Sequence, residues 1–312
     1  MSNSANIPTI ESISTMTNEV LDRFIRDGFA YVKIPNQLAE NKLDKLDKEA
    51  VAFFKLPKDK KEETRLDPIT LKGYVDRRKE EGKTACLEQM TFPIDSPVGP
   101  FANFKADIDV VSNTYRYEIV KPLLRAIFYR ILKPLDFASE EIDKLLSEAT
   151  DEIFTPMSLL CYPYTKNPEK DLALPEHVDE DMITVLWVAQ EGLQVWLEPE
   201  SSICGLLNDK VMGDWYDINP KTGYVVVNIG KALSWMLGKR CNAIKHRVLL
   251  PKKDRLSIGV FYNPPITYKM RDIVENKLLF NGSYSEYLKD HFSETSNDTF
   301  YGVIEQQETA TV

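Results

Sequence analysis

The sequence predicts a mainly β fold with flanking helices, an α+β organisation within one chain of 312 residues. Up to about residue 153, apolar residues recur at helical spacing, whereas short apolar runs bounded by turn residues dominate the rest. Short strands at regular intervals, with no helices between them, are typical of a sandwich or barrel and not of a parallel sheet. We therefore predict a helical region with a few strands over residues 1–150, packed on a β core over residues 151–312.

The first region combines helical and extended segments. Helices are expected over 18–27, in a second segment that ends before Pro57, over 105–133 and from Ser139 onward. Strands are expected over 29–34 and on both sides of a charged loop between residues 71 and 93. Gly28 follows the first helix where a left-handed C-cap belongs. Pro122 lies inside the long helical stretch, and because proline lacks an N–H group it predicts a kink or a break there.

The β core follows as a series of apolar runs. They cover residues 157–162, 183–189, 193–197, 224–229, 246–250 and 256–262. Turn residues such as Gly192 and Gly223 separate them. Residues 283–292 return to helical spacing. Because no repeat or low-complexity segment divides the chain, we expect both regions to share one hydrophobic core.

Composition excludes several classes of partner. The net charge of −9 argues against a general nucleic-acid or anionic-membrane binder, because phosphate backbones and acidic lipids repel a negative surface. No basic start precedes an apolar segment, and no apolar run is long enough to span a bilayer. The four cysteines are scattered without a CxxC pair, which favours reduced thiols. We therefore expect a cytoplasmic protein, a monomer, that acts on a small-molecule substrate.

Two histidines and one aspartate are the candidate metal ligands. His177 and Asp179 are separated by one residue, so on an extended strand their side chains point to the same side. His246 begins another apolar run, and the chain has only three histidines. Two imidazoles and one carboxylate suit an iron(II) ion that activates dioxygen, because they occupy one face of an octahedron and leave three positions open. We predict that these three residues share one iron(II) ion.

A candidate anion-binding pair begins nine residues after His246. Arg255 and Ser257 have the spacing that places two side chains on the same face of a strand. The guanidinium of arginine forks onto a carboxylate, and a hydroxyl on the same face adds a further hydrogen bond. Tyr162, on a neighbouring strand, is a third candidate donor. These residues predict a site for an anionic cosubstrate.

This order of motifs resembles the iron(II)/2-oxoglutarate-dependent dioxygenases of the plant type, the group that includes isopenicillin N synthase. The matching motifs are His177-x-Asp179, His246-Arg-Val, Arg255-x-Ser257 and Phe261-Tyr-Asn-Pro264, and similar residues extend over nearly the whole chain. The resemblance implies a double-stranded β-helix core, a jelly roll like that of the cupins. It also implies an oxidoreductase that uses iron(II), 2-oxoglutarate and O2. Arg255, Ser257 and Tyr162 would then bind 2-oxoglutarate.

The activity that the resemblance implies is oxidation of a small organic molecule with release of succinate and CO2, as in secondary metabolism. Hydroxylation, desaturation and oxidative ring closure all remain open. Analogy with the family places four residues in the substrate pocket: Tyr74, Val75, Arg77 and Gln89. The chain departs from frequent family residues at Leu160, at Lys231 and over residues 235–238. None of these is a predicted metal ligand, so the departures concern the substrate.

Three other functions are compatible with the same residues. In isopenicillin N synthase-like oxidases and cyclases, the Arg-x-Ser pair holds a substrate carboxylate and no 2-oxoglutarate is used, so succinate release distinguishes them. A catalytically silent, cupin-like binding protein is a second alternative, and failure to bind iron(II) would favour it. A zinc hydrolase on the same barrel is disfavoured, because no spare general base is evident beside the three ligands.

Overall fold

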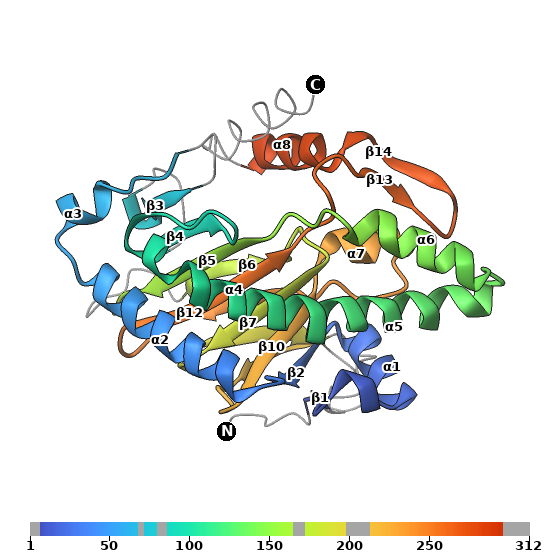
Figure 1. The fold of residues 1–312 in the computed structure, drawn as a ribbon, viewed down its shortest axis with the longest axis horizontal. Helices are drawn as coiled ribbons and strands as arrows, with labels where there is room; N and C mark the ends of the chain where they lie inside the picture. Colours follow the sequence, from blue (N-terminus) through green and yellow to red (C-terminus); the bar gives the residue numbers. More distant parts are fainter. Residues whose placement is uncertain (1–6, 68–71, 80–85, 165–171, 198–212, 296–312) are drawn as a thin grey trace.

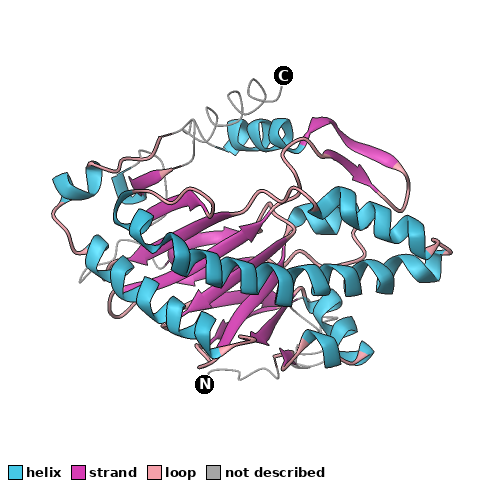
Figure 2. Ribbon diagram, viewed as in Figure 1, coloured by secondary structure: helices cyan, strands magenta, loops and turns pink. Residues whose placement is uncertain are grey.

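Two facing sheets and a layer of helices make up the fold. The computed structural model describes residues 7–67, 72–79, 86–164, 172–197 and 213–295. Figure 2 shows the strands gathered behind a layer of long helices. Within the described residues the strands form one sheet of eight, a second of four and a separate hairpin. Among the strands that the structure describes, the two larger sheets do not close into a single barrel.

The eight-stranded sheet draws on both halves of the chain. Its order is β1 (Thr9–Ile10), β2 (Phe29–Lys33), β10 (Tyr224–Ile229), β7 (Ile183–Val188), β12 (Arg255–Tyr262), β5 (Pro156–Tyr162), β4 (Glu88–Pro93) and β3 (Gly73–Asp76). All neighbours are antiparallel except β1 and β2. The first 150 residues therefore supply the strands at both edges of this sheet. The division of the chain near residue 150 stays a prediction.

The smaller sheet faces the inner side of the larger one. Its order is β6 (Leu172–His177), β11 (His246–Leu249), β8 (Leu193–Leu197) and β9 (Asp214–Ile218). Tyr162 and Val188 of the larger sheet pack with Val195 and Tyr216 of the smaller sheet in one buried cluster. The hairpin of β13 (Lys269–Asp272) and β14 (Lys277–Ser283) lies apart, next to the C-terminal helix α8 (Tyr284–Thr295) (Figure 1).

Helices cover the outer face of the larger sheet. Figure 1 shows α2 (Gln37–Phe54), α4 (Lys105–Thr114) and α5 (Lys121–Leu132) crossing it. The remaining helices are α1 (Asn18–Asp27), α3 (Lys58–Glu62), α6 (Ser139–Thr150) and α7 (Lys231–Met236), with short 3-10 turns at Ile13–Thr15, Arg77–Lys79, Gly99–Phe104 and Lys133–Leu135. Phe53 and Leu124 of these helices share a buried cluster with Leu159 and Ile258 of the sheet. Both faces of the larger sheet are therefore buried.

The mainly β fold with flanking helices is confirmed. The first helix shows why local sequence was informative. The Thr17 side chain accepts a hydrogen bond from the Val20 amide at its start, and Gly28 ends it with a φ of 80°. In contrast, the expectation of no helix between the core strands was wrong, because α7 lies between β10 and β11.

The helix expected over residues 105–133 contains a π-helical segment, where the sequence predicted a kink or a break at Pro122. Between α4 and α5 the chain forms a π-helical segment, Tyr115–Val120, and the helix continues past it. Pro122 lies in the first turn of α5, directly after the π-helical segment. The wider turn of the π-helical segment thus accommodates the proline, and the helix continues past it. Among the described residues, no helix has both the length and the apolar character that a membrane crossing requires.

Candidate metal centre

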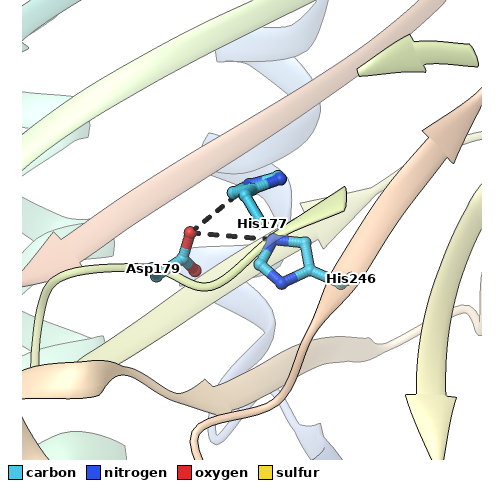
Figure 3. A group of neighbouring side chains, drawn as sticks. All are labelled: His177, Asp179 and His246. Atoms are coloured by element: carbon cyan, nitrogen blue, oxygen red, sulfur yellow. Dashed lines mark ion pairs between the residues drawn. The ribbon is translucent and has the colours of Figure 1, made fainter. Parts of the chain in front are cut away.

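Strand pairing brings the two histidines together. β6 ends at His177 and β11 begins at His246, and the two residues are direct partners in the antiparallel pair. Side chains at such paired positions lie on the same face with Cβ atoms about 5 Å apart. Their ring centroids are 4.1 Å apart (Figure 3). The expectation that His177 and Asp179 share a strand was wrong, because Asp179 lies in the loop that follows β6.

The hydrogen bonds of the two imidazole rings determine which ring nitrogen is available to bind a metal ion. The Nδ1 atom of His177 lies 2.9 Å from the Pro175 carbonyl, and that of His246 lies 3.3 Å from the Ile244 carbonyl. A carbonyl oxygen only accepts, so each Nδ1 carries the proton and each Nε2 keeps its lone pair. Burial, together with repulsion from His246, lowers the pKa of His177 to about 4. The His177 ring is therefore neutral near pH 7, as a metal ligand must be.

One oxygen of Asp179 faces both of these lone pairs. Its Oδ1 atom is 3.7 Å from His177 Nε2 and 3.6 Å from His246 Nε2 (Figure 3). Two donors that share one ion lie no more than about 4.2 Å apart, twice a typical bond of about 2.1 Å. Burial alone would raise the pKa of Asp179, but the two histidines and its hydrogen bonds outweigh burial and lower it. The carboxylate is therefore ionised, and the three side chains can surround a cation.

A second buried carboxylate lies beside the first. Thr184 Oγ1 is 2.6 Å from Asp179 Oδ2 and 2.9 Å from Asp181 Oδ2. Burial, and then the charge of Asp179, raise the pKa of Asp181 well above its ordinary value. A hydroxyl has one proton to donate, and the shorter contact is the one to Asp179. The raised pKa of Asp181 favours its neutral form, so the negative charge is favoured on Asp179.

Further along the inner face, Arg255, Ser257 and Tyr162 meet as a second group. Arg255 pairs with Tyr162 across β12 and β5, and its guanidinium lies 4.9 Å from the centre of the tyrosine ring. Its Nη1 donates to Ser257 Oγ at 3.4 Å. Arg255 is only 1% exposed, and within the described chain its Nε and Nη2 atoms have no hydrogen-bond partner. A buried cation with unpaired donors fits an anionic ligand such as a carboxylate.

Burial shifts the pKa of the two titratable residues of this group, Arg255 and Tyr162. It lowers the pKa of the Arg255 guanidinium below its ordinary value. It raises the pKa of Tyr162, although the positive charge of Arg255 acts in the opposite direction. Tyr162 therefore keeps its phenolic proton and can donate it to an anion.

Two helices hold the loop that carries Asp179. Glu180 accepts hydrogen bonds from Lys231 of α7 and from Tyr287 of α8. Tyr284 donates to the Glu180 carbonyl at 3.0 Å, and the Lys231 amide donates to the Asp179 carbonyl at 2.7 Å. The side chain of Lys231 also forms an ion pair with Glu180, next to the candidate ligand.

The four expected pocket residues do not all face the same way. Tyr74 is buried, donates to Glu88 at 2.6 Å and packs edge-on against Phe53 of α2, so it faces the helix layer. Val75 follows it on β3 and therefore faces inward. The placement of Tyr74 rules it out as part of the inner wall. On that wall Gln89 accepts from Arg77 Nε at 2.7 Å.

Sequence reasoning missed the residues that orient Asp179. Thr184 and Asn228 are buried polar residues in strands that are otherwise almost wholly apolar. A polar side chain in such a run carries a signal, because it must find a hydrogen-bond partner once buried. Thr184 and Asn228 both donate a hydrogen bond to the same carboxylate oxygen, Oδ2 of Asp179.

Sequence comparisons agree with this arrangement. A family model described as the 2OG-Fe(II) oxygenase superfamily matches residues 154–264, which include both groups of candidate residues. The 2-oxoglutarate-dependent dioxygenase 11 of Oryza sativa subsp. japonica is 24% identical over 280 residues, 84% of this chain and 71% of that protein. Flavonol synthase 1 of Crocosmia x crocosmiiflora is 27% identical over 220 residues, 68% of this chain and 62% of that protein.

Solved structures share the fold. A full-length Neurospora crassa protein, crystallised in complex with alpha-KG, has a TM-score of 0.70 at 22% identity, covering 93% of this chain and 96% of that one. A further crystal structure of the same Neurospora crassa protein contains alpha-KG and thymine, with a TM-score of 0.69, 22% identity and coverage of 93% and 97%. At this level of identity the similarity shows the fold alone, a jelly-roll core with flanking helices.

Proposed function

The chain belongs to the 2OG-Fe(II) oxygenase superfamily, and from this we propose that His177, Asp179 and His246 hold iron(II) in a dioxygenase. The enzyme oxidises a small organic molecule and releases succinate and CO2 from 2-oxoglutarate. The observation that supports this most is the buried guanidinium of Arg255, whose Nε and Nη2 atoms have no hydrogen-bond partner within the described chain. It lies against Tyr162, in the buried cluster between the two sheets that also contains Val195, the strand partner of His246.

The donor set suits iron(II). Two neutral imidazoles and one carboxylate form the ligand set of non-haem iron oxygenases. The single negative charge of Asp179 offsets part of the charge of a divalent ion in a buried site. An iron(II) ion held there supplies, with 2-oxoglutarate and O2, the oxidative decarboxylation and the oxidation of a substrate C–H bond. Hydroxylation, desaturation and ring closure are outcomes of this same chemistry.

The residues of the chain bind and orient the reactants. Arg255 and Ser257 bind the distal carboxylate of 2-oxoglutarate, and the Tyr162 hydroxyl donates a third hydrogen bond. Because all three side chains are buried, the ion pair forms away from water and is stronger than it would be at the surface. A rigid clamp on a strand fixes the position of the cosubstrate relative to Asp179 and the histidines.

We infer that the inner wall formed by β3, β4 and β5 contacts the substrate. Val75, Arg77 and Gln89 are its proposed contacts, whereas Tyr74 packs against Phe53 of the helix layer. Gln89 Nε2 donates to Thr91 Oγ1 at 2.7 Å and to Ser158 Oγ at 3.3 Å. Ser158 in turn pairs with Gly259 of β12, two residues from Ser257. A polar wall this close to the cosubstrate clamp suits a substrate that carries hydrogen-bonding groups.

The wall can be tested at Gln89. In Gln89→Leu, the KM for the identified substrate is expected to rise roughly 3- to 10-fold with kcat less affected, the effect of one or two lost hydrogen bonds. Gln194→Leu is the matched control, because Gln194 accepts a similar 2.8 Å hydrogen bond from Arg247 on the opposite face of the smaller sheet. Equal KM values in the wild type and Gln89→Leu would remove Gln89 from the substrate site.

The cellular location, the metabolic role and the oligomeric state of the protein are further proposals. We propose a cytoplasmic location, which the free thiols of Cys86, Cys161 and Cys241 support, while Cys204 lies outside the described residues. A role in secondary metabolism is supported by similarity to flavonol synthase 1. The monomeric state is a prediction that size-exclusion chromatography with light scattering would test.

The function itself is tested by product stoichiometry. The protein with added iron(II) and 2-oxoglutarate is incubated with a panel of amino acids, terpenoids, flavonoids and phytohormone-like acids. We expect one succinate for each substrate molecule oxidised, and no succinate when iron(II) is omitted. Oxygen consumption with an oxidised substrate but without succinate would indicate an isopenicillin N synthase-like oxidase. Absence of iron(II) binding would indicate a silent cupin-like protein.

A further inference from the structure

The two oxygens of the Asp179 carboxylate lie in different surroundings. Oδ1 faces the Nε2 atoms of His177 and His246 at 3.7 and 3.6 Å. Oδ2 accepts one hydrogen bond from Thr184 Oγ1 at 2.6 Å and another from Asn228 Nδ2 at 2.9 Å. The side chain that faces the candidate metal site is therefore asymmetric, with one oxygen already engaged by the protein.

Sheet geometry places the two donors side by side. Thr184 of β7 and Asn228 of β10 are direct partners in the antiparallel pair, so their side chains share the inner face. They are 2% and 6% exposed. Neighbouring positions in both strands are apolar, and a buried polar group without a hydrogen bond costs free energy. The hydrogen bonds to one oxygen satisfy both donors at once.

The backbone of Asp179 is fixed independently of this pair. The Lys231 amide donates to the Asp179 carbonyl at 2.7 Å. Gly230 approaches the same loop so closely that an added Cβ would lie 2.2 Å from the Asp181 carbonyl oxygen. With the main chain held in this way, rotation of the carboxylate is the remaining freedom. Thr184 and Asn228 are the groups that restrict it.

We propose that Thr184 and Asn228 are positioning residues that keep Oδ2 away from the metal, so that Asp179 binds through Oδ1 alone. This inference rests on the proposed function. A carboxylate that is free to rotate can bind a cation with one oxygen or with both. With both, it would occupy one of the three positions that 2-oxoglutarate and O2 need. The pair thus holds Asp179 in its orientation and preserves the open positions.

Metal binding without turnover tests the proposal. Titration calorimetry with Mn(II) is carried out on the wild type, Thr184→Val and Thr184→Ser. Valine has nearly the shape of threonine but no hydroxyl, whereas serine keeps it. We expect Thr184→Val to bind Mn(II) about 10-fold more weakly or worse, the range found for partners of metal ligands, and Thr184→Ser to restore the affinity. Asn228→Leu is expected to act like Thr184→Val.

A second measurement, the visible absorption spectrum of the Co(II)-substituted proteins, reports on the coordination of the metal. The spectrum is expected to change in Thr184→Val and to return in Thr184→Ser, which a general loss of stability would not produce. Thr155→Val is the matched control, because Thr155 is also buried but its hydroxyl has no hydrogen-bond partner among the described residues.

Two results would overturn the proposal. One is wild-type Mn(II) affinity in both Thr184→Val and Asn228→Leu, and the other is an equal loss of affinity in Thr155→Val. His177→Ala distinguishes this failure from failure of the proposed function. If His177→Ala loses Mn(II) while Thr184→Val keeps it, only the positioning role is wrong. If His177→Ala also binds like the wild type, the metal site itself is wrong.

Discussion

His246→Ala is expected to abolish metal binding and turnover while leaving the protein folded. The Nε2 atom of His246 is one of only three candidate donors among the described residues and lies 3.6 Å from Asp179 Oδ1. Removing an outer partner of a metal ligand costs about 10- to 100-fold in affinity or activity, so removing a ligand itself should weaken metal binding by more than about 100-fold. Titration with Mn(II) and an assay for succinate measure the two losses.

The fold should survive this change because the His246 ring lies against the two other candidate ligands, His177 and Asp179. Its ring makes a 3.3 Å contact with the Ile244 carbonyl, and its side chain faces the site. His291→Ala, in α8, changes the remaining histidine and serves as the control. Stoichiometric Mn(II) binding by His246→Ala would show that the distal ligand is misassigned.

Much of the fold was predictable because most residues of the core strands are apolar. β8 and β10 coincide with the expected segments, and β12 differs by one residue. Some of the strands that were missed have other compositions. β9 and β13 alternate or mix charged and apolar residues, and β6 contains a proline. Such strands are recognised by their partners in the sheet and not by their own sequence.

The direction of each side chain was harder to predict than the existence of its strand. Adjacent residues on a strand face opposite sides, so Tyr74 and Val75 could not both line one pocket. Sequence does not reveal which of the two faces inward, since helices bury the outer face of this sheet as thoroughly as the smaller sheet buries the inner one. The ionic residues of the site were easier to identify, because His, Asp and Arg at strand spacing carry a chemical meaning that Tyr does not.

Arg255→Leu is expected to raise the 2-oxoglutarate concentration needed for half-maximal binding by about 30-fold to several thousand-fold. Loss of one partner from a buried charge pair costs about 2–5 kcal/mol, and each 1.4 kcal/mol is a factor of ten. Titration of the metal-loaded protein with 2-oxoglutarate measures the change. Arg255→Lys is expected to recover only part of the affinity, since an ammonium cannot fork onto a carboxylate.

The same substitution has the opposite effect on the protein without its cosubstrate. There the Arg255 guanidinium is a buried charge with two nitrogens that lack partners among the described residues, and replacing such a group by an apolar side chain is neutral or stabilising. Thermal unfolding should therefore show Arg255→Leu at least as stable as the wild type in buffer, while 2-oxoglutarate stabilises only the wild type. A 2-oxoglutarate requirement unchanged by the substitution would mean that Arg255 holds a substrate carboxylate, as in the isopenicillin N synthase-like oxidases.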